Sequence, residues 1–113
     1  MNDKNVEFVA TLISILTVKE ALNSEMENFV KVRAAIDKRE LKDDDKVAIF
    51  NINSTTSYQV FFIDKDTNIE ELKEEFKKMN VRINYDSEQV LKRYIERLRI
   101  QNNSKPISNN NKQ

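Results

Sequence analysis

The stretch KVAIFNIN-STTS-YQVFFID, residues 46–64, decides the fold, because two strand-like runs flank a short polar connection. Both runs are rich in β-branched and aromatic residues, and small polar residues separate them, as in a turn. The stretch therefore predicts a β-hairpin over 46–64. A two-stranded hairpin is not stable alone, and both predicted strands carry apolar residues on both faces. We therefore expect one face to pack on helices and the other on a neighbour.

Upstream of the hairpin, the sequence predicts two consecutive helices. Two capping boxes lie seven residues apart, each with a hydroxyl residue followed three positions later by a glutamate: Thr17 with Glu20, and Ser24 with Glu27. They predict a short helix over 18–23 and a longer helix over 25–41, with a turn at Asn23 and Ser24. In the longer helix, three apolar residues at helical spacing are expected to face the core: Phe29, Val32 and Ile36.

The segment before these helices leaves two alternatives open. Across residues 3–16, four apolar residues recur at helical spacing and favour a buried helix: Val6, Val9, Ile13 and Leu16. A buried strand is the competing interpretation, because the intervening residues are also largely apolar.

Downstream of the hairpin, the pattern predicts a helix over 67–79, a short strand over 81–85 and a last helix over 87–100. A third capping box, Thr67 with Glu70, begins the first of these helices. The Asn-rich end predicts a disordered tail over 101–113. The sequence thus predicts a single α+β domain over residues 1–100.

The composition excludes many kinds of chemistry. The 113 residues include no Gly, no Cys, no His and no Trp, and 19 basic residues balance 19 acidic ones. Phosphate-binding loops depend on glycine, and transition-metal sites depend on His or Cys. We therefore expect no cofactor, no metal site and no enzymatic activity. The start of the chain has neither a secretory signal nor a membrane span, which predicts a cytoplasmic protein with no membrane partner.

A motif series resembles a known family. LTVKEALNS at 16–24 is followed by VKVRAAIDKREL at 30–41, then by the hairpin, then by NIEELKEEF at 68–76. This order resembles the winged helix-turn-helix domains of the excisionase and MerR type over residues 16–76. The resemblance implies a small winged-helix-like domain, in which residues 17–41 form the helix-turn-helix and the hairpin forms the wing.

The resemblance also implies binding to double-stranded DNA, with the 25–41 helix in the major groove. That helix is the most basic helical segment, although the whole chain is neutral. The candidate DNA contacts are the basic side chains of this region and the tip of the wing: Lys31, Arg33, Lys38, Arg39, Lys42, Ser54, Thr55 and Thr56. The expected function is a regulator of transcription, replication or partition in a mobile element. A homodimer, formed through the last helix and the hairpin, would double the phosphate contacts.

Two alternatives stay open. The lysines and arginines of the 25–41 helix are equally consistent with an ordinary solvated helix face. In addition, the chain has the features of a small protein-binding inhibitor or adaptor from a phage or plasmid, which would act through its exposed sheet edge. Aromatic residues dominate interface hot spots, so the anchors in that case would be Tyr58, Phe61, Phe62 and Tyr85.

Overall fold

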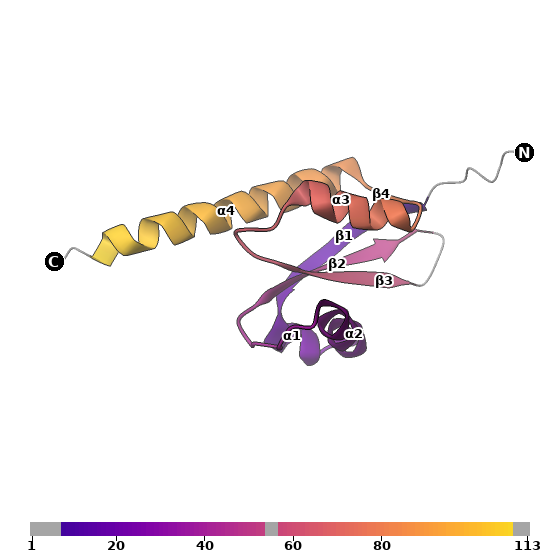
Figure 1. The fold of residues 1–113 in the computed structure, drawn as a ribbon, viewed down its shortest axis with the longest axis horizontal. Helices are drawn as coiled ribbons and strands as arrows, with labels where there is room; N and C mark the ends of the chain where they lie inside the picture. The colour runs from indigo at the N-terminus through magenta and orange to yellow at the C-terminus, as the bar shows by residue number, and fades with distance from the viewer. Residues whose placement is uncertain (1–7, 54–56, 110–113) are drawn as a thin grey trace, which may run out of the picture.

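The strands of the chain form one sheet, and helices cover both of its faces (Figure 1). The computed structural model describes residues 8–53 and 57–109, and its elements in chain order are β1 (Phe8–Thr17), α1 (Val18–Leu22), α2 (Glu27–Asp37), β2 (Lys46–Ile52), β3 (Tyr58–Ile63), α3 (Ile69–Lys78), β4 (Val81–Ile83) and α4 (Tyr85–Asn109). The strands form a curled mixed sheet in the order β3-β2-β1-β4. β1 and β4 run parallel, whereas the other neighbouring pairs are antiparallel. The predicted α+β class is confirmed.

The predicted hairpin is formed by β2 and β3, with Ala48 opposite Phe61 in the antiparallel register. Both faces of this hairpin are covered by helices of the same chain, so the expected neighbouring molecule is not needed to cover either face. α1 and α2 lie on one side of the sheet, and α3 and α4 lie on the other (Figure 1). Because successive residues of a strand point to opposite faces, a strand that is apolar throughout contributes side chains to the cores on both sides of the sheet.

The two cores differ in their side chains. On the α3 and α4 side, Phe50, Phe61 and Phe76 pack edge to face, with ring centroids 5.0 to 6.2 Å apart. On the α1 and α2 side, the buried residues are small and aliphatic: Val18, Ala21, Val30, Val47, Ile49 and Val60. We call these the aromatic layer and the aliphatic layer.

The first element is a strand, so the helix favoured for residues 3–16 is wrong over the part that the structure describes. Phe8–Thr17 forms β1, which pairs with β2 on one side and with β4 on the other. Its side chains contribute to both layers: Ala10 belongs to the aromatic core, and Leu16 packs against the aliphatic one. A strand buried on both faces has no polar alternation, and its apolar run therefore matches helical spacing as well.

The two predicted helices before the hairpin are present, with different ends. The Thr17 and Glu20 capping box is confirmed, and α1 ends at the predicted turn. The second capping box is not formed, because the Ser24 hydroxyl instead donates to the carbonyl oxygen of Ala21 and accepts from the amide of Met26. α2 therefore begins at Glu27, and it ends at Asp37, where Lys38 adopts a left-handed conformation with φ 55°.

The predicted inward face of α2 is also wrong. Val30 and Ala34 face the core, whereas the three residues expected there are exposed: Phe29, Val32 and Ile36. The helix therefore lies on the sheet with its small residues and turns its large apolar residues outward.

The elements after the hairpin follow the prediction closely. The predicted helix over 67–79 is α3, but the predicted capping box of Thr67 with Glu70 is wrong, because the Thr67 hydroxyl accepts from the amide of Asp64 at 2.8 Å. The cap is Asn68, whose side chain accepts from the amides of Glu70 and Glu71. The short strand is β4. The last helix is longer than predicted, because α4 continues to Asn109 through much of the segment expected to be disordered. Residues 110–113 lie outside the described residues.

The winged-helix arrangement is not formed. In that arrangement the hairpin is a wing beside a helix-turn-helix, but here β2 lies inside a four-strand sheet, between β1 and β3. α2 packs on this sheet through Val30 and Ala34 and has its opposite side in solvent. The resemblance failed because a similar order of helices and hairpin is compatible with two different sheets, and the decisive strand, β1, was favoured as a helix.

Candidate functional site

The basic residues expected to contact DNA are mostly engaged within the molecule. Arg33 lies with its guanidinium carbon 4.4 Å from the centroid of the Phe61 ring, and its Nη1 is 3.3 Å from Oδ1 of Asp37. Its side chain is only 12% exposed. The charge of this guanidinium therefore already has an aromatic and a carboxylate partner within the molecule.

Arg39 and Lys31 are engaged in a similar way. The Arg39 guanidinium lies 4.1 Å from the ring centroid of Phe62, and its Nη2 is 3.1 Å from Oδ2 of Asp45. Lys31 Nζ is 2.8 Å from Oε2 of Glu27, one turn earlier in α2. Three of the five basic candidates therefore pair with carboxylates of their own chain.

The other two basic candidates remain exposed. Lys38 is the left-handed cap of α2, and Lys42 lies in the connection to β2; neither forms an ion pair with a described residue. The wing candidates Ser54, Thr55 and Thr56 lie outside the described residues. The structure therefore does not join the eight predicted DNA contacts into one described surface.

An apolar surface on α2 is the feature that sequence reasoning missed. Phe29, Val32 and Ile36 are 38%, 58% and 61% exposed, and they follow one another at the spacing of one helix face. We call these three residues the α2 ridge. Single exposed apolar residues are ordinary, but a contiguous row marks an interaction surface.

A groove runs between the α2 ridge and β3. It has a volume of about 420 Å³, and its lining includes the ridge together with Ser57, Tyr58, Gln59 and Val60. Tyr58 packs edge to face on Phe29, with ring centroids 5.6 Å apart. The two aromatic rings connect the helix wall to the strand wall and make this end of the groove continuous.

The outer edge of β3 beside this groove is covered. Val60 is only 3% exposed, and Arg33 lies over the ring of the next residue, Phe61. Proteins commonly cover edge strands in this way, which prevents another strand from pairing with them. The groove therefore offers side chains, and not strand hydrogen bonds, to an incoming partner.

The four aromatic anchors predicted for a protein-binding surface are not together. Phe61 is buried in the aromatic layer, and Phe62 lies beneath Arg39. Tyr85 is 68% exposed at the start of α4, which is on the other side of the sheet (Figure 1). Of the four, only Tyr58 lines the groove beside α2. The sequence would have indicated the exposed ridge only if Val30 and Ala34 had been considered as the buried face of the helix.

A buried carboxylate joins α3 to α4. Glu88 accepts from Lys73, with Nζ and Oε2 3.2 Å apart, and pairs with Lys92 at the same distance. Burial by itself would raise the pKa of Glu88, but the hydrogen bonds from Lys73 and Lys92 outweigh it and hold the pKa below its usual value. The same hydrogen bond raises the pKa of Lys73. Glu88 and Lys73 therefore stay charged at neutral pH, as expected of a structural contact and not of a proton-transfer group.

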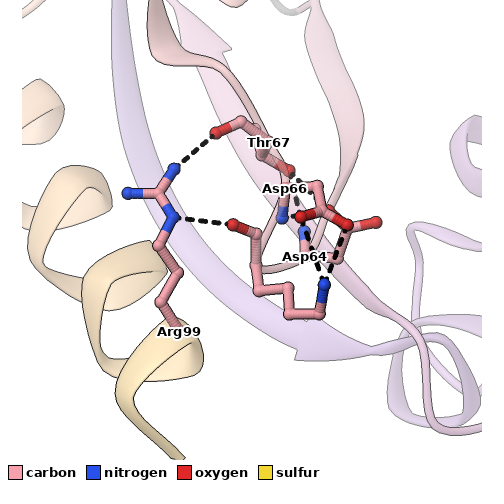
Figure 2. A network of polar contacts seen from close by, with 5 residues as sticks. Asp64, Asp66, Thr67 and Arg99 are labelled. Atoms are coloured by element: carbon pink, nitrogen blue, oxygen red, sulfur yellow. Dashed lines mark hydrogen bonds and ion pairs between the residues drawn. The ribbon is translucent and has the colours of Figure 1, made fainter. Parts of the chain in front are cut away.

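Arg99 fixes the loop between β3 and α3 to α4 (Figure 2). Its Nε donates to the carbonyl oxygen of Lys65 at 2.8 Å, and its Nη2 donates to that of Thr67 at 3.4 Å. Within the loop, Asp64 accepts from the amide of Asp66 at 2.8 Å. These contacts close the loop on itself and on α4, and they serve the fold.

Neither metal binding nor membrane crossing has support in the described part of the chain. Across residues 8–53 and 57–109, no group of three or more His, Cys, Asp or Glu side chains is placed to hold a metal ion. In the same ranges, no helix combines the length and the apolar character that a membrane span requires.

Comparison with known proteins overturns the winged-helix assignment and supplies another. No solved structure matches the chain. A family model described as a domain of unknown function, DUF749, matches residues 8–95, from the first residue of β1 into α4. This range contains the whole sheet and the helices that cover it. The chain therefore belongs to the DUF749 family.

Proposed function

We propose that this protein is a non-enzymatic protein-binding module, which docks an amphipathic helix of a partner protein on the α2 ridge. The observation that carries the proposal is the exposure of Phe29, Val32 and Ile36 in one row beside a groove. A helix that lies in an apolar groove is recognised through residues spaced three and four apart, and such a helix would match the spacing of the ridge.

The chemistry of the groove specifies the partner. Its polar lining residues are uncharged or paired: Asn28, Ser57 and Gln59 carry no charge, and Arg33 is paired with Asp37. The matching partner surface is therefore an apolar helix face with a neutral polar rim. An extended partner strand fits less well, because α2 covers the β3 edge at Val60.

DNA binding remains an untested prediction, and the geometry supports it less well. Non-specific affinity for DNA grows with the number of cations that can reach phosphates. Among the predicted contacts, Lys31, Arg33 and Arg39 each have an intramolecular carboxylate partner. A phosphate could bind these three side chains only by displacing their carboxylate partners.

Site-specific photocrosslinking in the native host tests the proposal. A photoreactive amino acid is placed at Val32 or Ile36 in the ridge and, as the matched control, at Glu75, an exposed position of α3 on the other side of the sheet. We expect the ridge positions to capture one partner protein, through a peptide whose sequence is an amphipathic helix. The control position should not capture that protein.

Three outcomes would contradict helix docking. The first is capture of the same proteins from Glu75 and from the ridge, which indicates collisional labelling. The second is a crosslink to a second copy of the chain alone, which indicates a homodimer. The third is a partner whose capture persists in the Ile36→Glu variant crosslinked from Val32, since a buried charge in the groove should abolish an apolar contact.

A further inference from the structure

β1 is much longer than the strand that pairs with its outer side. β4 pairs with β1 only from Phe8 to Ala10, and the chain then turns into α4. The edge is occupied at both ends: the hydroxyl oxygen of Ser87 accepts from the amide of Leu12 at 2.8 Å, and Oε1 of Glu20 accepts from the amide of Thr17 at 2.8 Å. Beyond Leu12, α4 and β1 diverge (Figure 1). Within the described ranges, no strand borders β1 on this side between Leu12 and Thr17.

The backbone of Ile15 faces this open edge. The β1–β2 register shifts between Leu12 and Ser14, as in a β-bulge. Beyond the shift, the amide of Val18 donates to the carbonyl oxygen of Asp45 at 2.8 Å, which identifies that pair as hydrogen-bonded. Hydrogen-bonded and non-hydrogen-bonded pairs alternate in antiparallel strands, so Ile15, opposite Ala48, directs its N–H and C=O away from β2.

Apolar side chains line the space beside this edge. A groove of about 430 Å³ lies between β1 residues 11–15 and the first turns of α4. Ile13 is 54% exposed and Val90 is 45% exposed, and both line the groove together with Tyr94. β1 and α4 thus present apolar side chains to the same groove. Such a groove could hold an apolar side chain of a partner strand.

Two arginines of α4 lie outside the lining of the groove, close in sequence to its lining residue Tyr94. Arg97 lies one turn beyond Tyr94, with its guanidinium carbon 5.7 Å from the centroid of that ring. Arg93, on the neighbouring face of α4, has no ion pair with a described residue, and neither has Arg97. Asp86, at the other end of the groove, is the acidic residue of the lining. Carboxylates of a partner would therefore be attracted to the Tyr94 end.

We propose that the edge of β1 from Ile13 to Leu16, between the occupied amides of Leu12 and Thr17, binds an extended acidic segment of a partner protein as an added strand. The segment would exchange backbone hydrogen bonds with Ile15, place an apolar side chain between Ile13 and Val90, and pair its carboxylates with Arg93 and Arg97 of α4. Strand addition takes its affinity from main-chain hydrogen bonds and its specificity from pockets for alternate side chains. This site is separate from the α2 ridge, and the two proposals stand or fall independently.

Peptide binding measured by fluorescence anisotropy tests the charge and shape of the site. The probe is a short labelled peptide in which valine and glutamate alternate, and its control has lysine in place of glutamate. We expect the full chain to bind only the acidic peptide, more weakly as salt rises. The double variant Arg93→Glu, Arg97→Glu should weaken binding by about tenfold or more, because it reverses two charges that steer the ligand. The matched variant Lys78→Glu, at an exposed position of α3, should change it by less than about twofold.

Amide hydrogen exchange tests the strand itself. If the peptide pairs with β1, exchange of the Ile15 amide should slow in the complex, whereas amides of α2 should be unchanged. Binding of the acidic peptide without protection of Ile15 would overturn strand addition, and equal binding of the lysine peptide would overturn the charge assignment. Failure of the acidic peptide to bind would overturn the proposal as a whole. If sedimentation showed a dimer whose formation protects Ile15, the occupant would be a second copy, and the acidic partner would be wrong.

Discussion

The two layers of the molecule use the same sheet for different purposes. The aromatic layer buries Phe50, Phe76 and Leu91 completely, beneath α3 and α4. The aliphatic layer buries Val30 and other small residues beneath α1 and α2. Large side chains bury more apolar area per residue, so most of the hydrophobic stabilisation lies in the aromatic layer.

The difference explains where the exposed apolar surface lies. In the aromatic layer, the large residues of α3, Leu72 and Phe76, face the sheet. In α2 the small residues face the sheet, and the large residues Val32 and Ile36 face solvent. A helix held by small residues keeps its large ones available for a partner. One layer is therefore suited to stability and the other to binding.

The largest effect should come from the aromatic layer. Phe76→Ala removes a fully buried ring that contacts both Phe50 and Phe61, and it should lower the free energy of unfolding by about 3–5 kcal/mol. Val30→Ala removes a smaller buried side chain from the aliphatic layer and should cost about 1–2 kcal/mol. Urea unfolding of both variants measures the difference. Equal losses would show that the two layers contribute alike.

A smaller effect should follow from breaking the contact between α2 and the sheet edge. Arg33→Ala removes the guanidinium that lies over Phe61 and pairs with Asp37, and we expect a loss of about 1 kcal/mol in the free energy of unfolding. Lys31→Ala, which removes an exposed i,i+4 pair with Glu27, should cost less than about 0.5 kcal/mol. If Arg33→Ala were neutral by the same urea titration, Arg33 would be available for an external ligand.

The contact between α3 and α4 should show a dependence on pH. Because the pKa of Glu88 is lowered in the folded protein, its ionised form stabilises the fold above the pKa of the unfolded chain, and this contribution disappears as pH falls through the folded pKa. The stability lost in Glu88→Gln should therefore be constant near neutral pH and shrink below about pH 4. Thermal unfolding of both proteins across this range measures it. A difference that grows on acidification would contradict the lowered pKa.

The smallest effect on stability should come from the α2 ridge. Val32→Asn and Ile36→Asn change exposed side chains and should alter the free energy of unfolding by less than about 0.5 kcal/mol each. Losses of the size expected for Val30→Ala would place the ridge in the core, as the sequence pattern predicted. The proposed helix partner should be lost from both variants, which separates binding from stability.

Local signals in the sequence were enough for several elements. The hairpin, α3 and β4 were predicted because alternation, helical spacing and turn residues agree in each of them. The Thr17 and Glu20 box is confirmed, whereas the hydroxyls of Ser24 and Thr67 bond elsewhere, so the motif by itself does not decide which box forms. These elements depend on neighbours in sequence, and sequence reasoning has access to them.

The remaining features depend on distant contacts. β1 was favoured as a helix because its faces enter two different cores, and this removes the alternation that identifies a strand. α2 carries two apolar faces, and only the packing against Val18 and Val47 decides that Val30 is the buried one. The open edge of β1 required knowledge of how far β4 extends. Arg33 was interpreted as a DNA contact because its partner Phe61 lies on a strand far along the chain.

The absence of glycine has a consequence for the unfolded chain. The structure needs a positive φ at two described positions, and Lys38 and Asn80 adopt it there without glycine. A chain of average composition and this length would contain about eight glycines, each adding freedom that folding must remove. Replacing a glycine by a residue with a Cβ at a compatible site is worth about 0.4–1 kcal/mol, through the lower entropy of the denatured ensemble. The lower entropy of the denatured state therefore adds to the stability that the two layers supply. This added stability allows the chain to leave the α2 ridge exposed to water.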